Sequence, residues 1–243
     1  MKRFIALMVC MVSFIISSHA VSYPDVKYGP WVQNVSETGF TVLWKSTQKN
    51  FAYVEVAPDD GTPFEMCDRQ RFYNVVAGRR IAGEFHSVPV TGLEPGKSYR
   101  YRIYAKVVEN DESAYAVDYG PERRVKIAGD GVIRTLDRNA DKCRFFMLND
   151  IHLKDDRYKA LTKGVKASDF DFVVMNGDMA SYISEADTML RHVFHVVPSL
   201  TSSIPTVYTR GNHETRGRQA HLLPKFCPTS TGRPYYLLRQ GPV

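Results

Sequence analysis

Three short polar clusters carry the residues that are most capable of chemistry in this chain, and each follows an apolar run. They are Asn149-Asp150-Ile151-His152, Asn176-Gly177-Asp178 and Arg210-Gly211-Asn212-His213-Glu214. Between them they bring carboxylates, imidazoles and an amide oxygen, a mixture that suits divalent or trivalent transition metals better than a thiolate site would. The glycines allow sharp turns and a close approach of the backbone. The clusters therefore predict a metal site, provided that the fold brings them together.

The apolar runs before the clusters predict the elements that position them. Residues 144–148, 170–175 and 204–209 favour β-strands, the first of them buried, and residues 156–168 and 184–197 favour the helices between them. Alternation of strand and helix indicates an α/β domain with right-handed crossovers and a parallel sheet. Loops at the carboxyl ends of parallel strands converge on one crevice, so the three clusters are expected to meet there.

The two predicted helices have recognisable apolar faces. In the first, Leu161 and Val165 lie four residues apart. In the second, Ser184 is the expected N-cap. Its apolar face would consist of Ala186, Met189, Leu190, Val193, Phe194 and Val197. His192 and His195 lie off that face and are expected to point to solvent.

Taken in order, the clusters resemble the motifs of the calcineurin-like metallophosphoesterase superfamily. The resemblance implies two divalent or mixed-valence transition metal ions (Fe, Mn or Zn), which activate a water molecule for in-line attack on phosphorus. It implies that Asp150 and His152 bind one ion, that Asp178 bridges both ions, and that Asn212 binds the second. His213 would not be a ligand but the catalytic residue, contacting the substrate phosphate or protonating the leaving group.

The expected substrate is a small phosphate ester, most simply a monoester. Asn212 and His213 would contact it, and Arg210 and Arg216 flank the same loop, where a guanidinium suits bidentate binding of an anion. A solvated surface role for the two arginines stays open. Two other functions also stay open: a phosphodiesterase or nuclease on the same scaffold, and a non-catalytic surface binding module.

Residues 24–135 predict an all-β region, a sandwich of about seven short strands. The strand candidates are residues 40–44, 51–56, 86–90 and 99–105. The segments Gly29-Pro30-Trp31, residues 41–44 and residues 93–101 resemble an immunoglobulin- or fibronectin type III-like sandwich, and more narrowly the N-terminal domain of purple acid phosphatases. The resemblance implies that the Tyr99 hydroxyl bonds to backbone near Leu93. Trp44 is expected in the core and His86 at the surface.

The first twenty residues predict a secretory signal. Lys2 and Arg3 precede an apolar run at residues 4–16, and small residues end at Ala20, the expected cleavage point. The run is short for a membrane anchor, so no stable membrane insertion is expected. The product would be periplasmic or extracellular. Cleavage lowers the formal net charge from +6 to +4, and no nucleic-acid partner is expected.

The predicted organisation is a signal peptide at 1–20, the sandwich at 24–135 and a metallophosphoesterase domain at 137–243. The last part is expected to be only the N-terminal half of such a domain, truncated at its C-terminus, because the family's later histidine motifs do not follow His213. Only His221 does. The resemblance therefore implies that this truncated chain binds metal weakly and hydrolyses phosphate esters poorly. Three cysteines, Cys67, Cys143 and Cys227, remain after cleavage, and their odd number and wide spacing indicate no disulfide framework.

Overall fold

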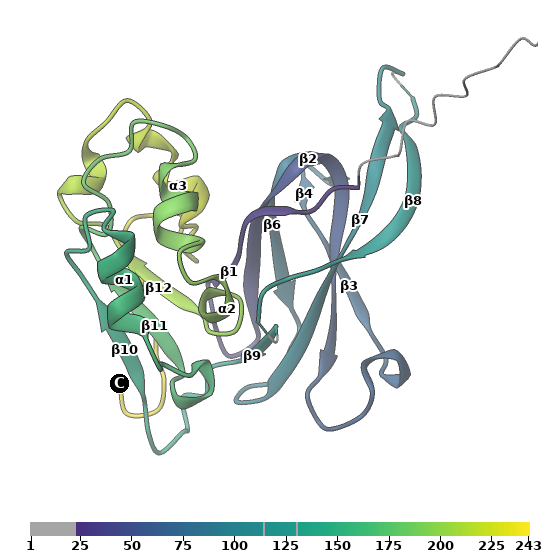
Figure 1. The fold of residues 1–243 in the computed structure, drawn as a ribbon. Helices are drawn as coiled ribbons and strands as arrows, with labels where there is room; N and C mark the ends of the chain where they lie inside the picture. The colour runs from purple at the N-terminus through teal and green to yellow at the C-terminus, as the bar shows by residue number, and fades with distance from the viewer. Residues whose placement is uncertain (1–22, 114, 130) are drawn as a thin grey trace, which may run out of the picture.

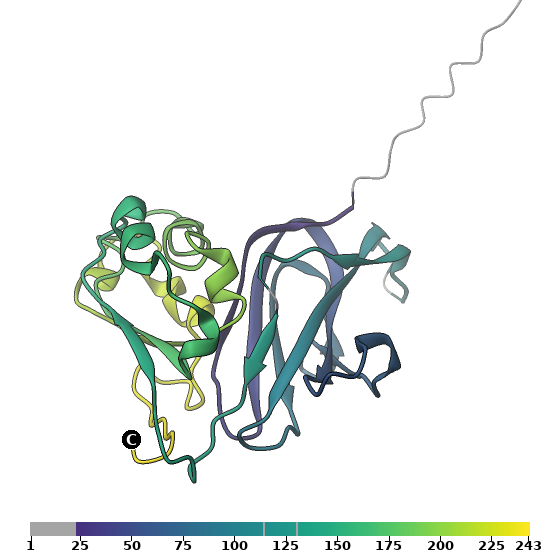
Figure 2. The ribbon, with the colours of Figure 1, turned by 60° about the horizontal axis from the view of Figure 1, so that its bottom comes forward.

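The computed structural model describes residues 23–113, 115–129 and 131–243. The predicted signal peptide and its cleavage point lie outside these residues. A region of antiparallel strands lies beside a smaller region of parallel strands and short helices, in both views of the ribbon (Figures 1 and 2). Among the described residues no helix is both long and apolar enough to cross a membrane.

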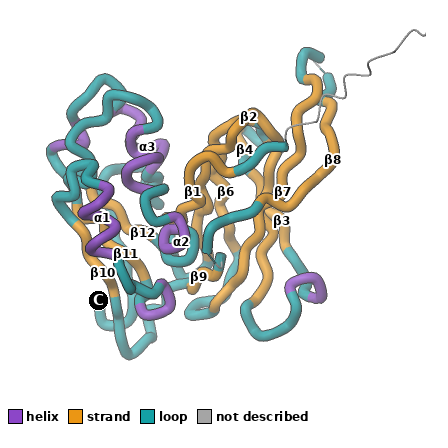
Figure 3. The backbone as a smooth tube through the Cα atoms, viewed as in Figure 1, coloured by secondary structure: helices purple, strands orange, loops and turns teal. Residues whose placement is uncertain are grey.

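The first region is built from strands, as the tube in Figure 3 shows. They are β1 (Val26–Gln33), β2 (Gly39–Pro58), β3 (Gln70–Tyr73), β4 (Val75–Val76), β5 (Arg79–Arg80), β6 (Gly83–Thr91), β7 (Ser98–Asn110), β8 (Asp118–Val125) and β9 (Val132–Arg134). A seven-stranded sheet runs in the order β1-β2-β7-β8, with β3 and β6 also paired to β2 and β9 to β7. The prediction of an antiparallel, strand-rich first half is confirmed.

The long strand β2 joins two strands that were predicted separately. Its first half pairs with β1 and β6, and its second half pairs with β3 and β7. The register with β6 shifts between Lys45 and Asn50, which lets one strand bend from one set of partners to the other. Inside, Trp44 is buried as predicted. The Tyr99 hydroxyl accepts a hydrogen bond from the Glu94 backbone N–H at 3.0 Å, next to the predicted position.

His86 is a correction, because it is fully buried and not at the surface. It lies on β6 directly opposite Trp44, and the two rings stack with centroids 4.6 Å apart. Side chains alternate along a strand, so His86 shares the inward face with Val88 and Val90. Neither ring nitrogen has a hydrogen-bond partner among the described residues. Burial disfavours the imidazolium and lowers the pKa of His86 to about 4.

This buried histidine predicts an acid-sensitive fold. An unfolded chain protonates His86 near pH 6.5, whereas the folded chain resists until about pH 4, so stability is lost as pH falls between these values. The loss amounts to at most about 3 kcal/mol. His86→Phe keeps a ring on Trp44 and cannot titrate. Urea unfolding at pH 7, 5.5 and 4.5 should therefore show a flatter decline for His86→Phe than for the wild type or for the exposed control His221→Gln. Equal declines in all three proteins would refute the prediction.

The second region contains a three-stranded parallel sheet, β10 (Phe145–Leu148), β11 (Phe172–Asn176) and β12 (Thr206–Thr209), in that order. The helices around it are short: α1 (Asp155–Thr162), α2 (Pro198–Thr201) and α3 (Leu223–Phe226), a π-helix at Leu190–Phe194, and 3-10 turns at Ala167–Asp169, His213–Thr215 and Ala220–Leu222. All three predicted strands are confirmed. However, β10 is an edge strand, and Phe145 and Met147 on one of its faces are exposed. The expectation that this strand is buried is therefore wrong for the face that carries these two residues.

The predicted helix at 184–197 is wrong in extent. Only its centre is helical, although Met189, Leu190, Val193 and Phe194 are buried as expected and Ala186 is not. Ser184 caps nothing, because the chain before the helix is held in a loop. There the Ile183 N–H donates to Arg216 O at 2.8 Å and the Ile183 carbonyl accepts from Gln219 N–H at 2.9 Å. These long-range bonds outweigh the local helical pattern.

The predicted helix at 156–168 is also shorter than expected. The helix α1 ends at Thr162, before Gly164 with φ +82°. Its buried residues are Tyr158 and Thr162, while Leu161 is exposed. The predicted apolar pair therefore does not define the inner face.

One of the two hydrophobic clusters joins the two regions. Trp31 on β1 stacks on Phe194 with centroids 4.7 Å apart, and its indole N–H donates to Phe226 O at 3.1 Å. Both residues lie in a single buried cluster with the residues around the parallel sheet. The Tyr101 hydroxyl donates to Ser202 O at 2.8 Å across the same boundary. The first region therefore buttresses the second directly and is not a loosely tethered module.

Two histidines expected to face solvent are instead half-buried with partners. His195 Nδ1 accepts a hydrogen bond from Gly29 N–H at 3.1 Å, at the boundary of the two regions. His192 Nδ1 lies 2.9 Å from a carboxylate oxygen of Asp155, at the start of α1. Both are off the apolar face, as the sequence pattern indicates, but neighbouring segments cover that side.

Candidate metal centre

The three polar clusters meet where the parallel strands end. His152 follows β10, Asp178 follows β11 and His213 follows β12. One donor atom from each of these three side chains lies within 4.8 Å of the other two. The rings of His152 and His213 meet edge to face, with centroids 4.5 Å apart. The convergence expected from a parallel sheet is therefore present at the level of side chains.

Unusual backbone conformations place these residues. Asp150, His152, Leu153 and Asp178 all have positive φ, between 51° and 61°, which is uncommon for residues other than glycine. Hydrogen bonds between the first two loops hold them there: His152 N–H donates to Asp178 O, and Leu153 N–H donates to Met179 O, both at 3.0 Å. A run of strained residues is maintained where the surrounding structure over-determines it, and such runs cluster at functional sites.

Two glycines make the approach of the second and third loops possible. A Cβ on Gly211 would overlap the Asp178 carboxylate and lie 2.6 Å from the Asp178 backbone nitrogen. A Cβ on Gly177, which has φ +76°, would lie 2.8 Å from the Gly211 nitrogen. Any side chain at either position would push Asp178 away from the third loop. Steric exclusion of any larger side chain therefore explains why glycine stands at the start of the Gly-Asp and Gly-Asn-His-Glu patterns.

Glu214 is the residue whose role the sequence did not reveal. It is completely buried, and its carboxylate accepts hydrogen bonds from Asp178 N–H, Ala180 N–H and Gly211 N–H at 2.9–3.0 Å and from the Tyr208 hydroxyl at 2.9 Å. Its acidic character beside His213 is visible in the sequence, but its four donors come from two segments, residues 178–180 and 208–211. Glu214 clamps the loop after β11 to the loop after β12.

Weakening that clamp should cost stability. Glu214→Gln puts an amide NH₂ where backbone N–H groups point, and leaving a buried donor unsatisfied costs about 1–3 kcal/mol. Tyr208→Phe removes one of the four bonds and should cost less, about 1 kcal/mol. Urea unfolding measures both, with the exposed Glu185→Gln as the matched control. A midpoint for Glu214→Gln equal to that of the control would show that the clamp contributes nothing.

Asp150 lies beside the three-donor group but not within it. Its side chain is 63% exposed, and one carboxylate oxygen is 3.6 Å from His152 Nε2. The other oxygen accepts a hydrogen bond from the Asn149 amide at 2.6 Å.

Asn212 and Arg216 form a network of hydrogen bonds next to Asp178. With the amide oriented so that both groups are satisfied, Asn212 donates to Asp178 Oδ2 at 3.1 Å and accepts from an Arg216 guanidinium nitrogen at 3.1 Å. Asp178 Oδ1 accepts from the His213 backbone N–H at 3.0 Å. Arg210 is not part of this network. It lines a separate cavity together with Tyr208, Leu223 and Cys227.

His213 Nδ1 has two competing partners. It lies 3.1 Å from Ser181 O, which can only accept, and 3.1 Å from an Arg216 guanidinium nitrogen, which can only donate. Bonding to Ser181 puts the proton on Nδ1 and leaves a lone pair on Nε2, as a metal ligand requires. Bonding to Arg216 puts the proton on Nε2, which can then donate a hydrogen bond to an oxygen. The tautomer thus decides whether Nε2 faces the site as an acceptor or as a hydrogen-bond donor.

The donor set fits a transition metal ion. Two imidazoles and a carboxylate are usual ligands of zinc and comparable ions, and bonds of about 2.0–2.2 Å place such donors about 3–4 Å apart. The donors of His152, Asp178 and His213, within 4.8 Å of one another, lie close to that spacing. No second group of three such residues occurs in the described ranges 23–113, 115–129 and 131–243.

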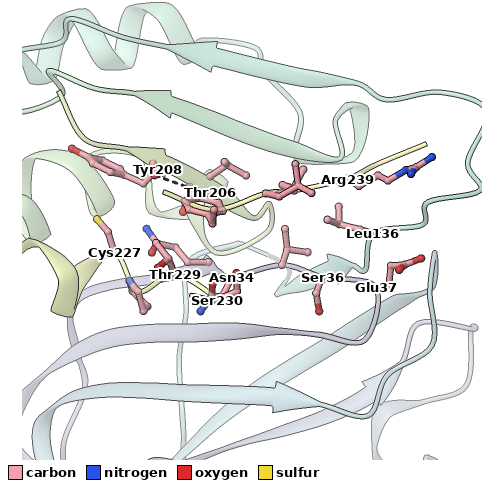
Figure 4. Close-up of a pocket in the computed structure, with 17 residues that line it drawn as sticks. Asn34, Ser36, Glu37, Leu136, Thr206, Tyr208, Cys227, Thr229, Ser230 and Arg239 are labelled. Atoms are coloured by element: carbon pink, nitrogen blue, oxygen red, sulfur yellow. Dashed lines mark hydrogen bonds between the residues drawn. The ribbon is translucent and has the colours of Figure 1, made fainter. Parts of the chain in front are cut away.

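A cavity drawn in Figure 4 lies elsewhere, between the loop after β1 and the chain around β12. It has a volume of about 180 Å³, and its lining includes Asn34, Leu136, Thr206 and Cys227. None of the predicted metal-site residues lines it. It is a space at the boundary of the two regions and is not part of the cluster.

No curated protein matches the chain. Among solved structures, a redesigned β-sandwich protein is similar over 44% of this chain and 90% of its own, at 18% identity and a TM-score of 0.26. Residues 143–239 match the family model described as calcineurin-like phosphoesterase, a stretch that contains β10, β11, β12 and every residue of the cluster.

Proposed function

We propose that this chain is a metal-dependent phosphoric ester hydrolase acting on small phosphate monoesters. The observation that carries the proposal is the meeting of His152, Asp178 and His213 donors within 4.8 Å at the carboxyl ends of three parallel strands. The family match over residues 143–239 supports the same reaction class. A bound transition metal ion supplies a polarised phosphoryl oxygen and a nucleophilic water at neutral pH.

In the two-ion arrangement that we propose, Asp178 is shared, Asp150 and His152 hold one ion, and Asn212 holds the other. The fixed surroundings of Asp178 support its central position. Its backbone N–H is bound by Glu214, and one of its oxygens by His213 N–H. With these contacts, the carboxylate needs no large rearrangement when an ion or an anion enters.

His213 and Arg216 act on the substrate in this proposal. In its imidazolium form His213 would donate Nδ1–H to Ser181 O, pass the Nε2 proton to the leaving-group oxygen and be left as neutral imidazole. The exposed Arg216 guanidinium can at the same time offer its remaining N–H groups to non-bridging phosphate oxygens. In this proposal His213 is the proton donor, the Ser181 carbonyl orients its ring, and Arg216 is an anion contact.

The test compares 4-nitrophenyl phosphate with bis(4-nitrophenyl) phosphate on the full chain loaded with Mn²⁺ or Zn²⁺. We expect faster turnover of the monoester. On phenyl phosphate, whose phenolate leaving group needs a proton far more than 4-nitrophenolate does, the kcat of His213→Gln should be lower by a factor of about 10²–10⁴, the usual contribution of general acid catalysis. His221→Gln is the matched control. Preference for the diester would favour the alternative phosphodiesterase or nuclease. An unchanged kcat in His213→Gln would remove its catalytic role.

We also propose export to the periplasm or the extracellular space and a fibronectin-like, purple acid phosphatase-type class for the first region. The basis for export is the basic start and short apolar run at residues 2–16. The basis for the class is the antiparallel sheet together with the Tyr99–Glu94 hydrogen bond. A mature N-terminus at Val21, measured by intact mass, would support cleavage after Ala20, and a retained leader would contradict it.

A further inference from the structure

A cavity larger than that of Figure 4 is lined by residues of β12, of the loop after it and of the segment 220–234, and Arg216 is not among them. Its volume is about 540 Å³, within the range of about 300–1,000 Å³ that is usual for small-molecule sites. The lining is mainly apolar. It includes three buried residues, Tyr208, Leu223 and Cys227, and three less buried ones, Ala220, Pro224 and Pro228.

The edge of this cavity is positively charged. Arg210, His221 and Arg233 line it, and all three are exposed. Arg210 has no ion-pair or hydrogen-bond partner among the described residues, and Arg233 donates to the Tyr235 hydroxyl at 2.9 Å. The one acidic lining residue is Glu214, whose charge already accepts four hydrogen bonds. No free carboxylate lines the cavity to oppose an anion.

We propose that this cavity binds an amphipathic organic anion. An aromatic or similarly flat apolar body would lie against Leu223, Ala220 and the prolines, and a single anionic group would be held between Arg210 and Arg233. Guanidinium groups suit such an anion because they are always charged and offer several donors in a plane. The site is distinct from the proposed metal centre and does not depend on hydrolysis.

The probe is 1-naphthalenesulfonate, an aromatic monoanion that contains no phosphate ester to hydrolyse. Calorimetric titration of the full chain should show saturable binding. Arg210→Gln and Arg233→Gln should each weaken it by about three- to tenfold, the loss of one charge-assisted contact. Arg124→Gln, which removes an equal charge from the exposed face of β8, is the control and should bind like the wild type. Neutral 1-naphthalenemethanol should bind at least tenfold more weakly than the sulfonate.

A cavity-filling variant tests the place of binding independently of charge. Ala220→Trp should abolish binding while the circular dichroism spectrum and the unfolding midpoint stay close to those of the wild type. Three results would overturn the proposal: no saturable binding to the wild type at millimolar probe, equal affinities in Arg210→Gln, Arg233→Gln and Arg124→Gln, or full binding by a folded Ala220→Trp protein.

Discussion

Asp178→Asn should remove both metal affinity and phosphate ester hydrolysis. The substitution keeps the size of the side chain, and its amide oxygen can still accept the His213 backbone N–H, so the loop should stay in place. What is lost is the negative charge between His152 and His213. Stabilisation of the transition state by a bound ion amounts to several kcal/mol, so hydrolysis should fall by about a thousandfold or more.

The matched control for this substitution is Asp156→Asn, the same chemical change on the exposed face of α1. Both variants are dialysed after loading with Mn²⁺, and bound metal and turnover of 4-nitrophenyl phosphate are then measured. The control should retain both. If Asp178→Asn keeps its metal and its turnover, the shared-carboxylate assignment is wrong.

Trp31→Ala should produce the largest loss of stability. Trp31 is fully buried, stacks on Phe194, and donates its indole N–H to Phe226 O, so it anchors two segments of the second region. Truncating a buried tryptophan costs about 3–5 kcal/mol. Because the lost contacts belong to the core that also holds the parallel sheet, metal binding should weaken along with stability.

The chain contains two tryptophans, which makes the measurement selective. In Trp31→Ala the remaining Trp44 reports on the core of the first region. Unfolding followed by Trp44 fluorescence and by far-ultraviolet circular dichroism should then separate into two transitions. Trp31→Phe, which keeps an aromatic ring against Phe194, should lose less. A cost below 1 kcal/mol for Trp31→Ala would mean that the shared core contributes little.

The strands and the meeting of the three loops were predictable from the sequence, because the parallel register follows from alternation of strand and helix. His152, Asp178 and His213 lie directly after β10, β11 and β12, where the topology requires them. The helices were less predictable. The pattern at 184–197 has a helical period, but long-range hydrogen bonds from Ile183 to Arg216 and Gln219 decide its start.

Buried polar residues were the least predictable part of the chain. His86 could be placed only once its pairing with Trp44 was known, since a single histidine before an apolar run does not reveal its own direction. Glu214 carries a visible acidic signal, yet its partners come from segments that are distant in sequence. Arg210 and Arg216 look equivalent in the sequence, but in the structure Arg210 lines the larger cavity whereas Arg216 hydrogen-bonds to Asn212.

We propose, above all, that the site around His152 and Asp178 binds a metal ion that hydrolysis requires, with His213 beside it as the proton donor. The most direct test removes metal from the full chain with a chelator, titrates Mn²⁺ back, and follows bound ion and turnover of 4-nitrophenyl phosphate in the same samples. We predict that turnover disappears on chelation and returns in proportion to the amount of bound ion. Turnover that survives complete removal of metal, or a chain that binds no Mn²⁺ or Zn²⁺, would contradict it.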